Sequence, residues 1–340
     1  MQKLFIISNE SVYKNKGKFF CDNIDMKSTP EGLSNKFDVH IIARQSEKIR
    51  SHNINLKNIK TFRNIVSFLY GILSIAKVKD SKYLIISISP FTMMACVILR
   101  FFKKKSIVYL RSDGYAEYKS IFGFFGPLIY HFMFMIVSKN SHLISCREYI
   151  LKKKKGHVIA PSQLTNKWFS NIKENQLEKI KLLYVGRIKV EKGIFSLLKI
   201  LKKNSENITL SILGSEKAFN NGIKQNNVTV YEIENNEENL IKFYDDHNIF
   251  VLPSYTEGHP MALLEALSRF KPVIIFKEIE HVIEGKKGIF VAERNSRSFL
   301  EKVSYIMNNY ESIQRDMKEN TLPTKSDFLK EISKLISNFN

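Results

Sequence analysis

Two segments of the sequence combine cations, carboxylates and glycines in patterns that suit an anionic ligand. In the first segment, residues 182–193, an apolar run ends at Gly186 and is followed by Arg187 and Lys192. Two fixed cations at such a turn would neutralise charge that develops on a departing phosphate group. Taken alone, the same residues also fit a solvated surface, because charged side chains are normally exposed.

The second segment, residues 251–267, predicts a strand, a turn and a helix whose first turn includes Pro260. Proline is tolerated there, since its missing N–H would have no partner within the helix. The free N–H groups of that turn form an anion site at the carboxyl edge of a parallel sheet. Glu257 precedes the helix and Glu265 lies two turns inside it. Their carboxylates can accept hydrogen bonds from the hydroxyl groups of a ligand that carries the phosphates.

These segments lie within a regular alternation of short apolar runs and helical patterns, which is typical of parallel sheets covered by helices. In the first half of the chain the runs are residues 4–7, 39–43, 84–88, 107–110 and 142–145. In the second half they are residues 182–185, 209–213, 228–231, 249–252, 272–276 and 288–291. A chain of 340 residues also exceeds the usual size of one core. We therefore expect an α/β protein with two Rossmann-like, doubly wound domains.

We predict the domain boundaries from changes in local composition along the chain. A lysine run at residues 152–155 and a polar stretch at residues 171–179 interrupt the alternation. We predict an N-terminal domain at residues 1–160, a linker at 161–180, a C-terminal domain at 181–315 and a C-terminal helical segment at 316–340. In the last segment Leu329, Ile332 and Ile336 share one helix face.

The chain is basic, with a formal charge of +20, and the excess is one-sided. Residues 1–160 hold 27 Lys and Arg against 10 Asp and Glu, whereas residues 161–340 hold 26 against 23. Such a field attracts an anionic lipid surface or a phosphate-bearing polymer. A nucleic-acid-binding protein is therefore an alternative, but no RNA-binding aromatic motif, zinc finger or recognition helix accompanies the charge, so we expect no specific nucleic acid.

Two apolar stretches are candidates for membrane contact. Pro90 divides residues 83–102 into a strand and a helix, which argues against a span. Residues 121–137 carry six aromatic residues between Lys119 and Lys139. Both a core helix and a helix in the bilayer interface fit this composition, and the charge asymmetry favours peripheral membrane contact.

Cysteine usage and the N-terminus both suggest a cytoplasmic protein. Cys21, Cys96 and Cys146 are widely spaced and form no metal-binding or disulfide pattern. The first apolar run has four residues and no cleavage site, so it predicts a strand and not a signal peptide. We expect a cytoplasmic location, peripheral to the inner face of the cell membrane.

Together the two segments resemble the retaining family 4 glycosyltransferases of GT-B fold. That family has the pattern G-R-x-x-x-x-K-G followed by P-S-x-x-E-G-x-P-x-x-x-x-E-A, and this chain contains both. The resemblance implies two Rossmann-like domains that face each other across a cleft, with a C-terminal helix that crosses back to the N-terminal domain. It also implies that Arg187 and Lys192 bind the donor diphosphate, Glu257 contacts the transferred sugar and Glu265 holds the ribose. The remaining implied donor-binding residues are Gly186, Gly258, His259, Pro260, Met261, Ala262, Leu263 and Leu264.

The N-terminal domain departs from the family pattern, because the paired glycines that often follow the first strand are absent. Where many relatives have a histidine after a strand, this chain has Arg111 and Asp113. Either side chain is a candidate for the acceptor side, although Asp-Gly at this position also marks an ordinary turn.

By this resemblance the chain transfers a sugar, with retention, from a nucleoside diphosphate sugar to a lipid-linked or membrane-proximal glycan. The setting would be surface polysaccharide biosynthesis, such as that of lipopolysaccharide, O-antigen or capsule. No cofactor and no metal are expected, since Arg187, Lys192 and the helix N-terminus can offset the leaving charge. Another GT-B enzyme, such as a sugar-nucleotide epimerase, is the alternative within the same fold.

Overall fold

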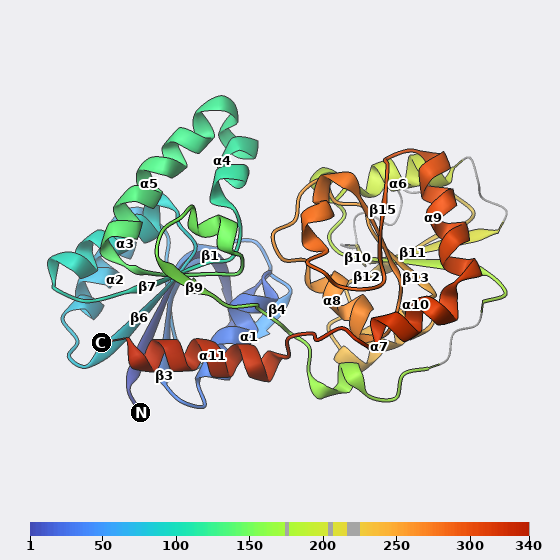
Figure 1. The fold of residues 1–340 in the computed structure, drawn as a ribbon. Coiled ribbons are helices and arrows are strands. Elements are labelled where there is room, and N and C mark those ends of the chain that lie inside the picture. The colour runs from blue at the N-terminus through green and yellow to red at the C-terminus, as the bar shows by residue number, and fades with distance from the viewer. Residues whose placement is uncertain (174–176, 203–206, 216–224, 340) are drawn as a thin grey trace. The chain divides into compact units, whose positions relative to one another are not determined.

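The computed structural model describes residues 1–173, 177–202, 207–215 and 225–339, and these form two compact units (Figure 1). The first unit comprises Met1–Gln163 and Lys325–Asn340, and the second comprises Leu164–Thr324. Both are built on parallel sheets with helices on their faces, as the sequence predicts. The chain returns to the first unit at Lys325 and not at residue 316, because Tyr310, Ile313 and Met317 are buried in the core of the second unit.

The first unit contains a parallel sheet in the order β5-β3-β1-β6-β7-β8-β9. A short antiparallel extension, formed by β2 and β4, continues from the far end of β1. The strands are β1 Lys3–Asn15, β2 Lys18–Cys21, β3 Asp38–Ser46, β4 His52–Ile54, β5 Asn58–Phe62, β6 Ser81–Ile86, β7 Ile107–Leu110, β8 His142–Ser145 and β9 Gly156–Val158.

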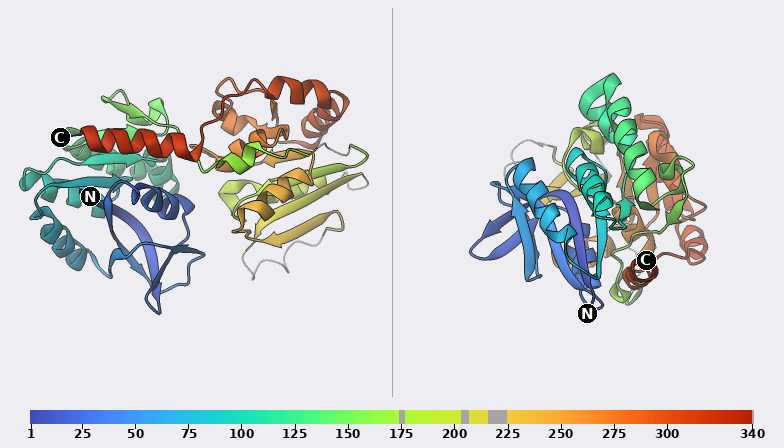
Figure 2. Two further views of the ribbon diagram at one scale, coloured as in Figure 1. Left: turned by 90° about the horizontal axis from the view of Figure 1, so that it is seen from below. Right: turned by 90° about the vertical axis from the view of Figure 1, so that its left-hand side faces the viewer.

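Alternating side chains of this sheet enter two separate cores. Phe5 and Ile7 point to one face, which is covered by α2 (Ile65–Ala76), α3 (Pro90–Phe101) and α5 (Gly126–Asn140). Leu4 and Ile6 point to the other face, which is covered by α1 (Ile24–Leu33) and α11 (Lys325–Asn338). The predicted C-terminal helix therefore packs on the N-terminal unit, as Figure 2 also shows.

The second unit has a parallel sheet in the order β12-β11-β10-β13-β14-β15. Numbered within the unit, this is the Rossmann order 3-2-1-4-5-6, which reverses direction between β10 and β13. The strands are β10 Ile180–Val185, β11 Ile208–Ser215, β12 Val228–Glu232, β13 Ile249–Leu252, β14 Val273–Phe276 and β15 Ile289–Ala292. The helices are α6 Ile194–Leu201, α7 Glu237–Asp245, α8 Met261–Ser268, α9 Ser296–Asn308 and α10 Tyr310–Met317.

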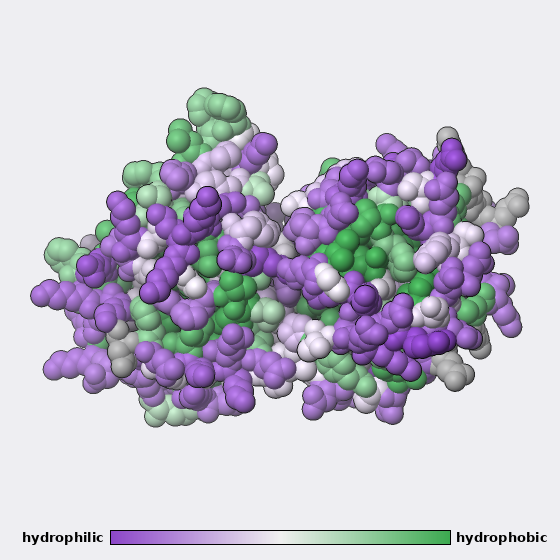
Figure 3. Space-filling model, in the orientation of Figure 1, coloured by the Kyte–Doolittle hydropathy of each residue, from purple (hydrophilic) through white to green (hydrophobic). Residues whose placement is uncertain are grey.

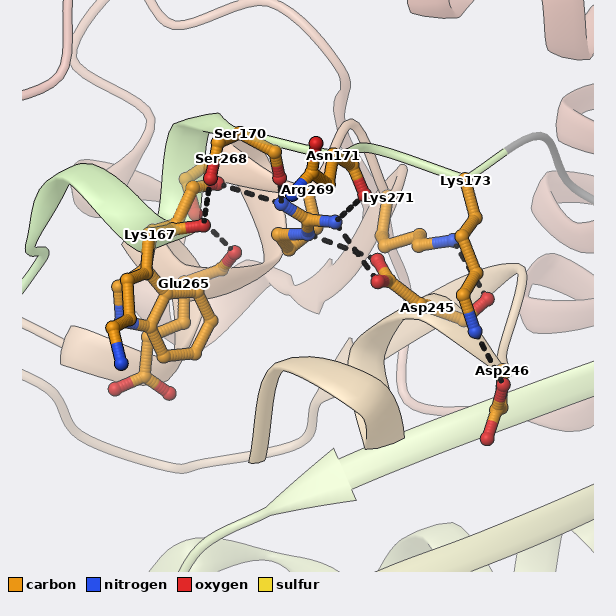
Figure 4. A network of polar contacts seen from close by, with 11 residues as sticks. Lys167, Ser170, Asn171, Lys173, Asp245, Asp246, Glu265, Ser268, Arg269 and Lys271 are labelled. Carbon is orange, nitrogen blue, oxygen red and sulfur yellow. Dashed lines mark hydrogen bonds and ion pairs between the residues drawn. The ribbon is translucent and has the colours of Figure 1, made fainter. Parts of the chain in front are cut away.

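A buried arginine fixes the segment that enters the second unit (Figure 4). Arg269 is fully buried, and its Nη2 lies 2.8 Å from Asp245 Oδ2. Its guanidinium also donates to the carbonyl oxygens of Trp168, Ser170 and Asn171 at 3.1, 2.7 and 3.0 Å. The predicted linker at residues 161–180 is therefore not a free connection, since its central part is held by hydrogen bonds in the second unit.

Candidate active site

The topology of the second unit brings the two chemistry-bearing segments to one sheet edge. β10 and β13 are adjacent and parallel, so the turns that follow them leave the sheet side by side. The backbone N–H of Tyr255, after β13, donates to the carbonyl of Glu191, after β10, at 3.0 Å. The site is therefore at the point where the strand order reverses, the usual ligand position of doubly wound sheets.

Lys192 and Glu257 form an ion pair at this edge. Lys192 Nζ lies 2.7 Å from Glu257 Oε1, and the Ser254 hydroxyl donates to the same oxygen at 2.6 Å. The side chain of Lys192 is 22% exposed and that of Glu257 is 10% exposed. Partial burial strengthens such a charge-assisted contact while it leaves the ammonium group accessible to a ligand.

A glycine makes this close approach possible. Gly193 has φ +67°, in the left-handed region, and is the N-cap residue directly before α6. A Cβ atom on Gly193 would lie 1.8 Å from the carbonyl oxygen of Pro253. Any larger residue would push the turn after β10 away from the turn after β13, and would separate Lys192 from Glu257.

Arg187 supplies a second cation at the same turn. Its side chain is exposed, and within the described part of the chain no hydrogen bond or ion pair holds its guanidinium. Its carbonyl oxygen accepts a hydrogen bond of 2.8 Å from the buried Tyr184 hydroxyl, which fixes the backbone of the turn. The Arg187 guanidinium is therefore available to an anion without breaking an existing contact.

The helix α8 offers backbone donors at the same edge. Pro260 occupies the N-cap position, one residue before the helix, and its side chain makes no capping hydrogen bond. Leu263 and Leu264 are buried in the core, whereas Met261 and Ala262 are partly exposed. Of the predicted donor-binding residues 258–264, those two leucines can therefore contribute only backbone groups.

Glu265 lies further along α8 in a less polar environment. Its Oε2 accepts a hydrogen bond of 2.7 Å from the hydroxyl of the fully buried Tyr244. Burial raises the pKa of Glu265 to about 7, above its ordinary value of 4.5. Glu265 is thus a buried carboxyl with one oxygen engaged by Tyr244.

Arg294 is a residue of this site that the sequence analysis missed. Its guanidinium donates to the carbonyl oxygens of Pro253 and Ser254 at 2.8 and 3.2 Å. It also forms a bidentate ion pair with Glu278, with contacts of 2.7 and 3.0 Å. Arg294 follows β15 and belongs to no motif at residues 182–193 or 251–267, so only the fold reveals this contact.

The same guanidinium lies between two aromatic rings. It is 4.0 Å from the ring centroid of Tyr255 and 4.4 Å from that of Phe276. Stacking on both faces and hydrogen bonding at the edge hold Arg294 in one position. The turn that carries Ser254 and Glu257 is therefore attached to a rigid cation.

The predicted acceptor-side residues lie in the first unit and have different surroundings. Asp113 caps α4 (Gly114–Phe122) by accepting from the N–H of Tyr115 at 2.9 Å, and it pairs with Lys152 at 3.2 Å. The turn interpretation of Asp113 thus accounts for its contacts.

Arg111 is as exposed as Asp113, at 22% against 21%, but it has fewer polar contacts among the described residues. It lines a small pocket with Tyr109 and Asp25, near the point where β1 and β6 reverse the strand order. Its Nη1 lies 3.8 Å from Asp25 Oδ2, and its buried Nε has no hydrogen-bond partner among the described residues. Arg111 therefore remains the candidate for the acceptor side.

The described residues contain no group of three His, Cys, Asp or Glu side chains that could hold a metal ion. Cys21, Cys96 and Cys146 are each buried and free. Independence from metal stays a prediction about the reaction, based on Arg187, Lys192 and the first turn of α8.

Comparison with known proteins agrees with this geometry. Residues 166–322 match the family model of the glycosyl transferases group 1. The chain is 23% identical over 337 residues to the capsular polysaccharide biosynthesis glycosyltransferase CapM of Staphylococcus aureus, a match that covers 87% of each protein. It is 32% identical over 92 residues, 27% of this chain and 23% of the relative, to the putative teichuronic acid biosynthesis glycosyltransferase TuaC of Bacillus subtilis.

Solved structures show the same fold at low sequence identity. Anabaena HepE, in complex with UDP, matches with a TM-score of 0.71 and 11% identity over 100% of both chains. WaaG, a glycosyltransferase of lipopolysaccharide biosynthesis, matches with a TM-score of 0.66 and 13% identity over 98% of this chain and 100% of WaaG. Residues 166–322 therefore resemble the group 1 glycosyl transferases, and the chain as a whole has the GT-B fold.

Proposed function

We propose that this chain transfers a sugar from a nucleoside diphosphate sugar to a lipid-linked or membrane-proximal glycan, with retention of anomeric configuration. The observation that carries the proposal is the ion pair of Lys192 and Glu257, with the exposed Arg187 at the same turn, at the strand reversal of the second unit. This edge matches the needs of a diphosphate ligand that bears hydroxyl groups.

In this proposal the donor diphosphate lies against Arg187, Lys192 and the first turn of α8. Lys192 is held by Glu257 and the N–H groups of α8 are held by the helix, so these groups stabilise the charge of the leaving diphosphate without large rearrangement. Lys192 can share its ammonium group between Glu257 and a phosphate oxygen, because an ammonium group has three donors. Glu257 contacts the transferred sugar, and Glu265 accepts hydrogen bonds from the ribose.

The reaction exchanges one bond at the anomeric carbon for another on the same face. The bond from that carbon to the diphosphate oxygen breaks, and the bond to the acceptor hydroxyl oxygen forms. The proton of the acceptor hydroxyl passes to the leaving diphosphate. No protein nucleophile takes part, and the cations of the second unit carry the charge that a metal ion carries in other transferases.

The proposed setting is surface polysaccharide synthesis at the inner face of the cell membrane. The similarity to CapM, a capsular polysaccharide enzyme, and to WaaG, a lipopolysaccharide enzyme, supports it, as does the +17 charge of residues 1–160. Residues 1–160 would then bind the acceptor and meet the anionic lipid surface.

A screen with UDP-, GDP- and ADP-sugars tests the proposal. We expect one donor to give release of nucleoside diphosphate that accelerates when lipid extract from the source cells is added. The product should keep the donor's anomeric configuration by NMR. Release without transfer of label to any glycan, or conversion of one sugar nucleotide into another, would instead identify a different GT-B activity.

A further inference from the structure

A cluster of apolar side chains protrudes from the first unit. It lies at the end of a helical hairpin made of α4, the 3-10 turn Gly123–Phe125 and α5, visible as a green surface at the top of Figure 3. We call it the apolar tip. Its exposed side chains are Ile121, Phe122, Phe124, Phe125, Leu128, Ile129 and Phe132, and Phe124 is the most exposed at 90%.

The opposite face of the same hairpin belongs to the core. Tyr130, Met133, Phe134 and Val137 are buried against the sheet. The sequence left a core helix and an interfacial helix as alternatives for residues 121–137, and the structure shows one buried face and one exposed face. The exposure of the apolar tip is thus not a result of missing core packing.

The bend of the hairpin distinguishes the apolar tip from a membrane span. By length and composition alone, Gly114–Asn140 could cross a membrane. However, Gly123 has φ +59° between α4 and α5, and a Cβ on Gly114 would lie 2.0 Å from the Tyr130 ring of the opposite arm. The arms have nine and 15 residues, or about 14 and 23 Å, whereas the hydrocarbon core is about 30 Å thick.

We propose that the apolar tip inserts into the headgroup boundary of an anionic bilayer. Its seven side chains are all Phe, Leu or Ile and have no polar atom, and residues 120–138 contain no Asp, Glu, Lys or Arg. A protein partner usually requires a mixture of apolar and hydrogen-bonding anchors, which these seven side chains do not supply. A lipid bilayer, in contrast to a protein partner, requires only an apolar surface that can reach below the headgroups.

Depth and charge both fit the lipid surface. The exposed side chains from Phe125, directly before α5, to Phe132 span about 10 Å along the helix axis. If the end of the hairpin enters first, this length reaches the 5–10 Å depth to which interfacial helices bury their apolar face. The exposed Lys119 precedes the apolar tip, and residues 1–160 carry a charge of +17. Anionic headgroups would complement that charge while the acyl boundary receives the phenylalanines. This contact would give the protein access to a lipid-linked acceptor, and that use of it rests on the proposed function.

Vesicle sedimentation of the full-length protein tests the inference. Wild type should bind vesicles of phosphatidylcholine with phosphatidylglycerol, and should bind pure phosphatidylcholine less. Phe124→Ser/Phe125→Ser should reduce the partition coefficient at least tenfold, roughly, because two exposed rings no longer enter the bilayer. The matched control Ile49→Ser/Tyr305→Ser removes two side chains that are 81% and 53% exposed elsewhere, and it should bind like wild type.

A fluorescent variant adds a readout of insertion. Phe124→Trp should show a blue shift of its emission on anionic vesicles and quenching by brominated acyl chains. The single natural tryptophan, Trp168, is buried in the second unit and supplies a constant background. Equal vesicle binding by wild type and the Phe124→Ser/Phe125→Ser variant would overturn the inference. So would formation of a dimer through the apolar tip without any lipid binding.

Release of nucleoside diphosphate in the absence of lipid separates this inference from the proposed function. The Phe124→Ser/Phe125→Ser variant should keep that release at the wild-type rate, since both residues lie outside the donor site. If the vesicle results hold and no sugar nucleotide is turned over, the proposed function fails and the membrane contact stands. If turnover and transfer hold while vesicle binding is unchanged in the variant, only the membrane contact fails.

Discussion

The two units of this molecule reverse their strand order in the same way but place different chemistry at the reversal. In the second unit the edge between β10 and β13 gathers Arg187, Lys192 and Glu257. In the first unit the edge between β1 and β6 holds a small pocket with Arg111 and Asp25. The fold supplies a ligand position twice, and the side chains decide which ligand each position suits.

The largest expected effect concerns the second unit. Lys192→Ala should lower kcat by about 10²–10³-fold, the range found when one preorganised donor is removed from an active site. The reason is that the leaving diphosphate gains negative charge between the bound donor and the transition state. Steady-state kinetics with the identified donor measures the effect, and thermal unfolding controls for loss of fold. Glu257→Gln should impair both kcat and the donor KM.

The next prediction concerns Arg294, which lies outside both sequence motifs. Arg294 holds the turn after β13 at the sheet edge of the second unit. Arg294→Ala should lower kcat by about 10–100-fold, since it releases the turn that positions Glu257. Arg294→Lys should recover little, because an ammonium group cannot make the bidentate contact with Glu278 and stack on two rings. The matched control is Glu278→Gln, which removes the charge of the ion pair but keeps the stacking of Arg294 on Tyr255 and Phe276. A kcat of wild-type size in Arg294→Ala would show that the turn is rigid without it.

Glu265 should make donor binding depend on pH. The pKa of this carboxyl is about 7 in the folded protein, so it becomes protonated as the pH falls below that value and then loses an acceptor for the ribose. The donor KM should rise by up to about tenfold per pH unit there. Glu265→Gln should have a raised and pH-independent KM, and a profile that still follows pH in this variant would assign the titration elsewhere.

The same carboxyl should affect stability with a defined sign. Because its folded pKa is raised above 4.5, the charged form is disfavoured in the fold, and stability falls as the pH rises from about 4.5 to 7. Glu265→Gln should therefore raise the melting temperature at pH 8 and have little effect at pH 4. An equal shift at both values would indicate a packing effect and not a titration.

The smallest effect is expected in the first unit, at Asp113. Asp113→Ala should cost about 1 kcal/mol of unfolding free energy, because it removes the cap of α4. Donor kinetics should stay unchanged. Urea unfolding measures the first quantity, and Asp113→Asn, which can still cap the helix, should restore most of the stability. A large loss of kcat in Asp113→Asn would instead give this residue a role in the reaction.

The sequence predicts the buried strands well because they are short, apolar and flanked by helices. β7, β8 and β13 begin and end where the apolar runs do. β6 ends at Ile86, before the predicted residue 88, because Ser87 takes a positive φ of 60°. The extension formed by β2 and β4 was not predicted, since these strands have only four and three residues and carry no clear alternation.

The candidate site likewise has one part that local sequence predicts and one part that only the fold reveals. Residues within one local motif, such as Glu257 and Glu265, can be found from their spacing. The direct contact of Lys192 with Glu257 depends on the pairing of β10 with β13, and the contact of Arg294 depends on β15, so neither follows from local sequence. Asp113 is the opposite case. Its position after a strand made it a candidate for the acceptor side, but its carboxylate accepts a hydrogen bond from the first turn of α4.

Binding of nucleoside diphosphates tests the central claim most directly, because it requires neither the sugar nor the acceptor. Calorimetric titration with UDP, GDP and ADP should find one ligand for wild type. Arg187→Ala/Lys192→Ala should bind that ligand at least tenfold more weakly, roughly, since both charge-assisted contacts are lost. Arg111→Ala, a loss of positive charge in the first unit, should bind it as wild type does. Equal affinity in wild type and the double variant, or a loss confined to Arg111→Ala, would contradict the assignment of the donor site to the second unit.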